Sequence, residues 1–208
     1  MKTHPKFYLR HLPDREIKAV VIGGSAGSLK PLRFILSQMP SVPRLPIIIV
    51  VHRGKHDKKG LLRFLSSGSA SIKEPEDGEL IKPGINYLAP SGYHLLVKSR
   101  LEFSFSRAAP VRGARPSIDK LFQTAAEVFG TGLVGVILSG CGSDGALGLK
   151  RIREKGGMGI IQKPDGAEFD FMSKAAIKAG GVNKILNLEQ IAFFLSESTS
   201  SEHILQAF

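Results

Sequence analysis

Three polar residues of this 208-residue chain each directly follow, or lie just after, a short apolar run. Ser25 occupies a Gly-x-Ser-x-Gly segment, His52 follows an isoleucine- and valine-rich run, and Asp144 lies in a glycine-rich segment. A serine hydroxyl becomes a nucleophile when a neutral imidazole takes its proton, and a carboxylate can orient that imidazole. These residue types therefore indicate acyl-transfer chemistry, provided that the fold brings them together.

The segment around Ser25 has more than one interpretation. It fits a nucleophile elbow, in which glycines permit a tight strand-to-helix turn that exposes the hydroxyl. A dinucleotide loop would need Gly-x-Gly-x-x-Gly, but Ser25 and Ser28 replace the second and third glycines, and His52 stands where a ribose-binding acid belongs. A phosphate loop would end in Gly-Lys-Ser/Thr, which this segment lacks. A Gly/Ser turn without activity stays open.

The other two residues also have structural interpretations, as a polar-loop histidine and an ordinary helix N-cap. A metal pair of His52 and His56 is disfavoured, because His52 ends a strand and the i,i+4 spacing of a helix does not apply. Cys141 is the competing nucleophile, although a lone cysteine after an apolar strand is more often an inert packing residue. The order Ser…His…Asp differs from that of the α/β-hydrolases, so a serine hydrolase here would be built differently.

The surrounding pattern alternates between strands and helices. Strands are predicted at 19–23, 47–51, 133–138, 158–162 and 184–186, and helices at 29–38, 60–66, 118–129, 146–155, 173–179 and 188–195. This alternation predicts an α/β fold with a mainly parallel, doubly wound sheet and helices on both faces. In such a sheet the active site lies outside the carboxyl ends of the strands, where Ser25, His52 and Asp144 are expected.

Between residues 72 and 106, the alternation of strands and helices gives way to a pattern of short strands and turns. Short strands are predicted at 72–75, 85–89, 93–98 and 101–106, separated by turn dipeptides. This spacing favours an inserted region of antiparallel β-hairpins. We divide the chain into a basic extension at 1–16, a catalytic domain at 17–196 and a tail at 197–208.

Composition limits the function further. With 42% apolar and 23% charged residues, the chain is typical of a soluble globular protein. The single cysteine excludes an internal disulfide and fits a reducing, cytoplasmic compartment. No secretory signal or membrane-length apolar stretch is present, so membrane insertion is not expected. The net charge of +11 indicates an acidic partner, but no nucleic-acid-binding module is found, and nucleic acid is not expected.

Several blocks, in order, resemble the catalytic domain of the chemotaxis protein-glutamate methylesterases (CheB). The blocks are Val21–Gly27, Val51-His52, Ile81–Pro90, His94-Leu95, Arg115–Asp119 and Gly135–Ala146. The resemblance extends from about Lys18 to Leu195 and is more specific than the Gly-x-Ser-x-Gly pattern alone. It implies that Ser25, His52 and Asp144 form a catalytic triad without a cofactor or metal ion.

The resemblance also implies a substrate. The family hydrolyses γ-glutamyl methyl esters on chemoreceptor helices and can deamidate receptor glutamines. The expected partner is a methyl-accepting chemoreceptor or a similar acidic helical protein, which can itself be membrane-bound. The oxyanion hole is assigned to the backbone N–H groups of Ala26 and Cys141. The basic substrate rim is assigned to Arg53, Lys55, Arg112 and Arg115.

Three residues depart from the family pattern: Ala26 replaces the usual Thr, Ser28 a Gly and Cys141 a Met. They leave the triad residues in place but bear on the pocket and on substrate choice. A catalytically weak or inactive regulatory module that docks an acidic helix is therefore the alternative. Family members commonly carry an N-terminal phospho-receiver domain, which residues 1–16 are too few to supply, so we expect a free-standing enzyme or an excised domain.

Overall fold

The computed structural model describes residues 16–52, 60–66 and 71–200; nearly all of the predicted N-terminal extension and most of the tail lie outside these ranges. Seven strands of the described residues form one sheet in the order β3-β4-β2-β1-β7-β8-β9, and every neighbouring pair is parallel. The strands are β1 (Ala19–Gly24), β2 (Ile47–Val51), β3 (Ile72–Lys73), β4 (Asn86–Leu88), β7 (Leu133–Ile137), β8 (Met158–Gln162) and β9 (Lys184–Leu186). The predicted parallel, doubly wound sheet is confirmed.

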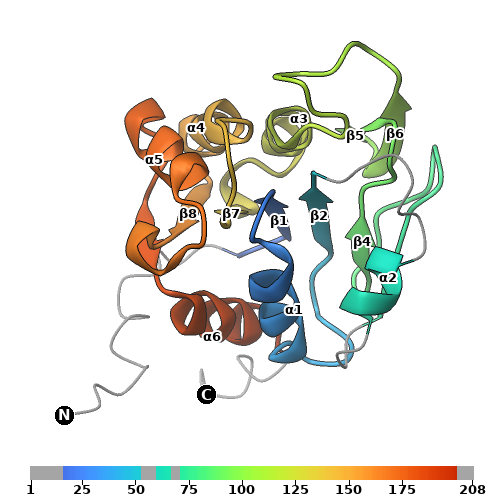
Figure 1. Ribbon diagram of the computed structural model, residues 1–208. Helices are drawn as coiled ribbons and strands as arrows, with labels where there is room; N and C mark the ends of the chain where they lie inside the picture. The colour runs from blue at the N-terminus through green and yellow to red at the C-terminus, as the bar shows by residue number, and fades with distance from the viewer. Residues whose placement is uncertain (1–15, 53–59, 67–70, 201–208) are drawn as a thin grey trace.

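Helices cover both faces of this sheet. They are α1 (Leu29–Ser37), α2 (Gly60–Leu65), α3 (Ile118–Phe129), α4 (Ala146–Glu154), α5 (Phe171–Ala179) and α6 (Leu188–Thr199), with 3₁₀ turns at Gly130–Gly132 and Pro164–Gly166. Figure 1 shows α3, α4 and α5 along one face and α1 and α6 along the other. Successive residues of β1 alternate between two apolar clusters: Val21 packs with the α3 side and Ile22 with the α1 side. Burial on both faces explains the continuous apolar runs in the sequence.

The region between residues 72 and 106 is only partly a hairpin. β5 (His94–Lys98) and β6 (Glu102–Ser106) are antiparallel and pack through Leu95 and Phe103 onto the α3 side. β3 and β4 instead continue the main sheet in parallel, so the expectation of antiparallel hairpins was wrong for them. Turn residues indicate where a strand ends but not which strand it pairs with. In addition, β4 is too short for an alternating pattern to show which of its faces are buried.

Two helix boundaries also differ from the sequence prediction. Helix α5 begins at Phe171 rather than at residue 173, and α6 continues past residue 195 to Thr199. Thr199 is buried, and its carbonyl accepts a hydrogen bond from the N–H of Arg44 at 2.7 Å. This tertiary contact supports a last turn rich in Ser and Thr, whose local propensity for helix is weak. None of the helices in the described ranges is long and apolar enough to cross a membrane.

The strand order reverses next to β1. The chain passes from β1 to β2 on one side and later adds β7, β8 and β9 on the other side. The point between β1 and β7 is therefore the topological switch of the sheet, where loops diverge and leave room for a ligand. Ser25 follows β1 and the segment with Asp144 follows β7, so both lie at this switch.

Candidate active site

Ser25 lies at the turn between β1 and α1. Its N–H donates to the carbonyl of Ser139 at 3.0 Å, and its own carbonyl accepts from Ser28 Oγ at 2.6 Å. Gly27 has a φ of +75°, and a Cβ there would lie 2.7 Å from Ser139 Oγ. The turn thus needs glycine at that position, both for its left-handed backbone and for its close approach to the loop after β7.

His52 follows β2 and is tied to the end of β1. Its N–H donates to the carbonyl of Gly24 at 3.1 Å, one residue before Ser25. Its Nε2 lies 2.8 Å from Asp144 Oδ2, and the two side chains are 19% and 3% exposed. The fold therefore brings together the histidine and the carboxylate that the sequence analysis selected.

Asp144 is held at the N-terminus of α3. Its Oδ1 accepts from Ser117 Oγ at 2.8 Å and from the N–H of Asp119 at 3.0 Å. Its Oδ2 accepts from the N–H of Ile118 at 2.7 Å as well as facing His52. Burial acts to raise the pKa of Asp144, but the hydrogen bonds from His52, Asp119, Ile118 and Ser117 outweigh it and lower the pKa. The carboxylate is therefore ionised at neutral pH and suited to orient an imidazole.

The serine and the histidine are neighbours without a mutual hydrogen bond. Among the described residues, none joins Ser25 Oγ to the His52 ring, so that contact of the expected triad is not formed here, whereas the His52–Asp144 contact is. Because Nε2 faces Asp144, Nδ1 is the ring nitrogen left to take a serine proton. In the usual Ser-His-Asp arrangement the carboxylate binds Nδ1, so the ring of His52 is oriented the other way round here.

The residues assigned to the oxyanion hole are exposed. Ala26 and Cys141 lie on the loops after β1 and β7, and within the described ranges their backbone N–H groups donate to no protein group. The adjacent N–H groups of Ser139 and Gly140 are used, by Gln162 and Phe169. Free donors beside Ser25 fit a site for a developing oxyanion, and that role stays a prediction. The view of Cys141 as a packing residue was wrong, because its side chain is exposed.

Sequence reasoning missed two residues that shape this site. Met172 is 1% exposed, and its Sδ occupies the space that a Cβ on Gly140 would need, while Ser25 Cβ lies 2.9 Å from the same point. Met172 thus packs near Ser25. His94 is fully buried, with Nδ1 accepting from the N–H of Ser117 and Nε2 3.1 Å from the carbonyl of Ala109. The only signal for His94 was its place in a family block, and no sequence pattern marked Met172.

The assigned basic rim is only partly visible. Arg53 and Lys55 lie outside the described residues. Arg112 donates to the carbonyl and the Oγ of Ser143 at 2.5 and 2.9 Å, next to Asp144. Arg115 donates to the carbonyls of its own loop, at Arg107 and Ala108. Both arginines therefore lie on the loop that leads into α3, and each also has a structural task.

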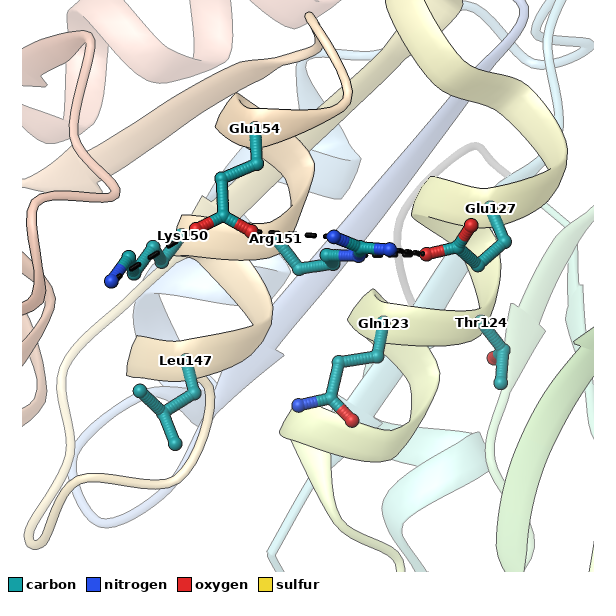
Figure 2. Close-up of a pocket in the computed structure, with 7 residues that line it drawn as sticks. All are labelled: Gln123, Thr124, Glu127, Leu147, Lys150, Arg151 and Glu154. Carbon is teal, nitrogen blue, oxygen red and sulfur yellow. Dashed lines mark hydrogen bonds and ion pairs between the residues drawn. The ribbon is translucent and has the colours of Figure 1, made fainter.

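A hollow of about 450 Å³ lies elsewhere, between α3 and α4. Figure 2 shows the residues that line it: Gln123, Thr124, Glu127, Leu147, Lys150, Arg151 and Glu154. Arg151 pairs with Glu127 and Glu154, and none of the candidate catalytic residues lines the hollow. In the described ranges no cluster of three or more His, Cys, Asp or Glu side chains could hold a metal ion.

Comparisons with known proteins identify relatives of this chain. A family model described as CheB methylesterase matches residues 20–195. A relative from Leptospira interrogans serovar copenhageni, provisionally named protein-glutamate methylesterase/protein-glutamine glutaminase, is 46% identical over 176 residues, or 84% of this chain and 91% of the relative. The enzyme of that name from Clostridium acetobutylicum is 34% identical over 85% of this chain, which spans 51% of its length. The solved CheB methylesterase catalytic domain of Thermotoga maritima superposes with a TM-score of 0.83 and 32% identity, over 88% of this chain and 99% of that one.

Proposed function

Because the chain belongs to the CheB methylesterase family, we propose that it is a serine esterase that hydrolyses γ-glutamyl methyl esters, and deamidates glutamines, on chemoreceptor-type proteins. The observation that carries the proposal is the 2.8 Å contact between His52 Nε2 and Asp144 Oδ2 beside Ser25. An imidazole that faces a carboxylate, close to a serine at the topological switch of the sheet, supports a histidine base and an orienting carboxylate for that serine.

The reaction begins with Ser25 as the nucleophile. Ser25 Oγ attacks the ester carbonyl while His52 Nδ1 takes the hydroxyl proton. Asp144 keeps the ring oriented and stabilises the imidazolium that forms. The N–H groups of Ala26 and Cys141 donate to the oxyanion, and each such donor is worth about 10²–10³ in rate.

The second half releases both products. His52 returns its proton to the departing methoxide, so methanol leaves and an acyl-enzyme remains on Ser25. Water then attacks the acyl carbon, His52 takes a proton from it, and Ser25 is regenerated as glutamate is released. With glutamine as substrate, ammonia leaves in place of methanol. No cofactor or metal ion takes part in any of these steps.

The expected partner is an acidic helical segment of a methyl-accepting receptor, acted on in the cytoplasm by the domain that we assign to residues 17–196. Arg112 supports this proposal because it lies beside the Asp144 segment with a side chain that is 37% exposed. Arg115 and Arg53 complete the proposed rim. A positive rim raises the local concentration of acidic substrate and its rate of association.

Methanol release from methylated receptor fragments tests the proposal. We expect the wild type to release methanol and Ser25→Ala to lose about 10⁴-fold or more in kcat. The exposed Ser37, at the end of α1, provides the matched control, and Ser37→Ala should act as wild type. A fluorophosphonate probe should label wild type and Ser37→Ala but not Ser25→Ala. A folded wild type that neither releases methanol nor is labelled would instead be a binding module.

A further inference from the structure

Asp119 is a buried carboxylate that the proposed reaction does not use. It lies in the first turn of α3, and its side chain is 5% exposed. Placing a charged carboxylate out of contact with water is costly unless hydrogen bonds or an opposite charge compensate. The partners of Asp119 therefore indicate what its burial achieves.

Those partners belong to the start of α4. Asp119 Oδ1 accepts from the N–H of Gly145 at 2.9 Å and from the N–H of Gly148 at 2.7 Å. Gly145 stands at the N-cap of α4 with a φ of +96° and has no side chain to cap the helix. Asp119 thus supplies from α3 the cap that α4 lacks locally.

The relation is reciprocal. Asp144, the residue just before Gly145, accepts from the N–H groups of Ile118 and Asp119 at the start of α3. Asp119 in α3 and Asp144 just before α4 therefore each accept from the N-terminal N–H groups of the other helix. We call these two contacts, from Asp119 to α4 and from Asp144 to α3, the reciprocal cap.

Arg112 secures the other side of the same segment. Besides donating to the carbonyl and Oγ of Ser143, its Nη1 lies 3.7 Å from Asp119 Oδ2. Ser143 is thus held by Arg112 and Gly145 by Asp119, so the backbone is fixed on both sides of Asp144. A carboxylate that must meet His52 at 2.8 Å gains accuracy from such support, since a misplacement of 1 Å can cost about 10²-fold in rate.

We propose that Asp119 is a positioning residue for the reaction: it holds the Ser143–Gly145 segment in the geometry in which Asp144 reaches His52. The inference rests on the proposed function, because it takes Asp144 as the carboxylate that orients the base. It assigns to Asp119 no contact with the substrate. What matters at residue 119 is an acceptor oxygen of the right reach, more than a charge.

Two substitutions distinguish a need for an acceptor oxygen at residue 119 from a need for a charge. Asp119→Ala removes the acceptor, so we expect kcat to fall about 10²-fold with little change in KM. Asp119→Asn keeps an Oδ1 that can accept from Gly145 and Gly148, so it should stay within about threefold of wild type. Glu127→Ala is the matched control: Glu127 is also an α3 carboxylate, but it binds Arg151 and Lys155 at the far end of the helix pair (Figure 2), and its kcat should equal that of wild type.

A substrate-independent measurement keeps this test distinct from that of the proposed function. The proton NMR resonance of His52 Nε2–H reports the hydrogen bond to Asp144 directly. We expect it downfield in wild type, Asp119→Asn and Glu127→Ala, and shifted or lost in Asp119→Ala. If Ser25→Ala equals wild type in methanol release, the proposed function fails, while this resonance still tests the reciprocal cap.

The proposal is overturned if folded Asp119→Ala keeps the wild-type resonance and the wild-type kcat. It is also overturned if Asp119→Asn and Asp119→Ala lose activity equally, because acceptance by Oδ1 would then be irrelevant. Circular dichroism establishes that each variant is folded. Should Asp119→Ala unfold, Asp119→Ser replaces it, because the shorter serine side chain cannot reach both N–H groups. The proposal is then overturned by a wild-type resonance and kcat in Asp119→Ser, or by equal losses of activity in Asp119→Ser and Asp119→Asn.

Discussion

The two ends of the α3–α4 pair are joined by carboxylates in contrasting ways. At the strand carboxyl ends, Asp144 and Asp119 are 3% and 5% exposed and accept mainly from backbone N–H groups. At the other end, Glu127 is 47% exposed and pairs with Arg151 and Lys155, at 2.6 Å each. Figure 2 shows the Arg151–Glu127 ion pair reaching across the gap between the helices. Distances alone would rank the two ends as equally strong.

Burial and the kind of donor make the difference. Backbone N–H groups are fixed by the helices, so a carboxylate that accepts from them is held in one position. Long side chains lose rotamer freedom when they pair, and water and salt screen their charges. The buried end can therefore position a catalytic carboxylate, whereas the exposed end contributes chiefly to solubility and modest stability.

The two buried aspartates also differ from each other. Burial raises the pKa of Asp119, and although the N–H of Gly148 opposes this, the nearby charge of Asp144 adds to it. Burial acts the same way on Asp144, but more donors converge on it, and its pKa is lowered. The larger number of donors on Asp144, together with the repulsion of Asp119 by the charge of Asp144, gives the two pKa shifts opposite signs.

Among the substitutions that test the contrast between the buried and exposed ends of the helix pair, Asp144→Asn is expected to have the largest effect on kcat and stability. Each oxygen of Asp144 has two polar partners: Oδ1 accepts from Ser117 and Asp119, and Oδ2 accepts from Ile118 and faces His52 Nε2. In the asparagine variant, the amide nitrogen would replace one of these acceptors and would face hydrogen-bond donors. We expect kcat for methanol release to fall about 10⁴-fold, with a stability loss of about 1–3 kcal/mol. Steady-state kinetics and urea unfolding at pH 7 measure the two effects.

The stability loss of Asp144→Asn should depend on pH in a defined direction. Because the folded pKa of Asp144 is lowered, its contribution is complete above the unfolded value of about 3.9 and is lost as the pH falls through the folded pKa. The stability gap between wild type and Asp144→Asn should therefore be widest above about pH 5 and narrow below about pH 4. A gap that widens toward acid would contradict the interpretation of Asp144 as a stabilised anion.

The next largest effect is expected from Gly148→Ala, which would push the two helices apart at the buried end. A Cβ on Gly148 would lie 2.6 Å from Phe122 Cβ and 3.1 Å from Asp119 Cα. Overpacking of this kind costs about 1–3 kcal/mol, although alanine recovers up to about 1 kcal/mol of helix propensity. We expect a lower melting temperature together with a lower kcat, because Asp119 moves with α3.

Gly166→Ala is the control for that substitution. A Cβ on Gly166 would meet no atom within 4 Å, and the φ of this residue lies outside the left-handed region, so both the melting temperature and the kcat of the variant should match wild type. If Gly148→Ala lowers stability without lowering kcat, the close approach of α3 and α4 serves packing alone.

The sequence indicated the candidate triad positions because they depend on local and repeating signals. Continuous apolar runs predicted strands buried on both faces, and glycine-rich turns marked the strand ends where Ser25, His52 and Asp144 lie. Parallel strands gather their carboxyl ends at one edge, so residues 92 positions apart, His52 and Asp144, could be expected to meet. The family resemblance reinforced that expectation and is confirmed by the family match.

The supporting contacts could not be predicted in the same way. Asp119 stood within a family block, yet its link to Gly145 and Gly148 depends on how two helices pack, which no periodicity encodes. The parallel direction of β3 and β4, and the exposure of Cys141, likewise depend on tertiary partners. Sequence thus indicated the candidate reacting groups, and the structure was needed to find what holds them.

The smallest effect is expected from Glu127→Gln at the exposed end. Its carboxylate has a lowered pKa because Lys155 and Arg151 bind it, but screening by water leaves such a pair little net effect on stability. We expect the melting temperature to change by less than about 2 °C and the difference to vanish at about 1 M salt, where the Debye length is about 3 Å, while kcat stays at its wild-type value. A salt-resistant loss of stability or activity would mean that the exposed end also positions the site, and the contrast between the two ends would not hold.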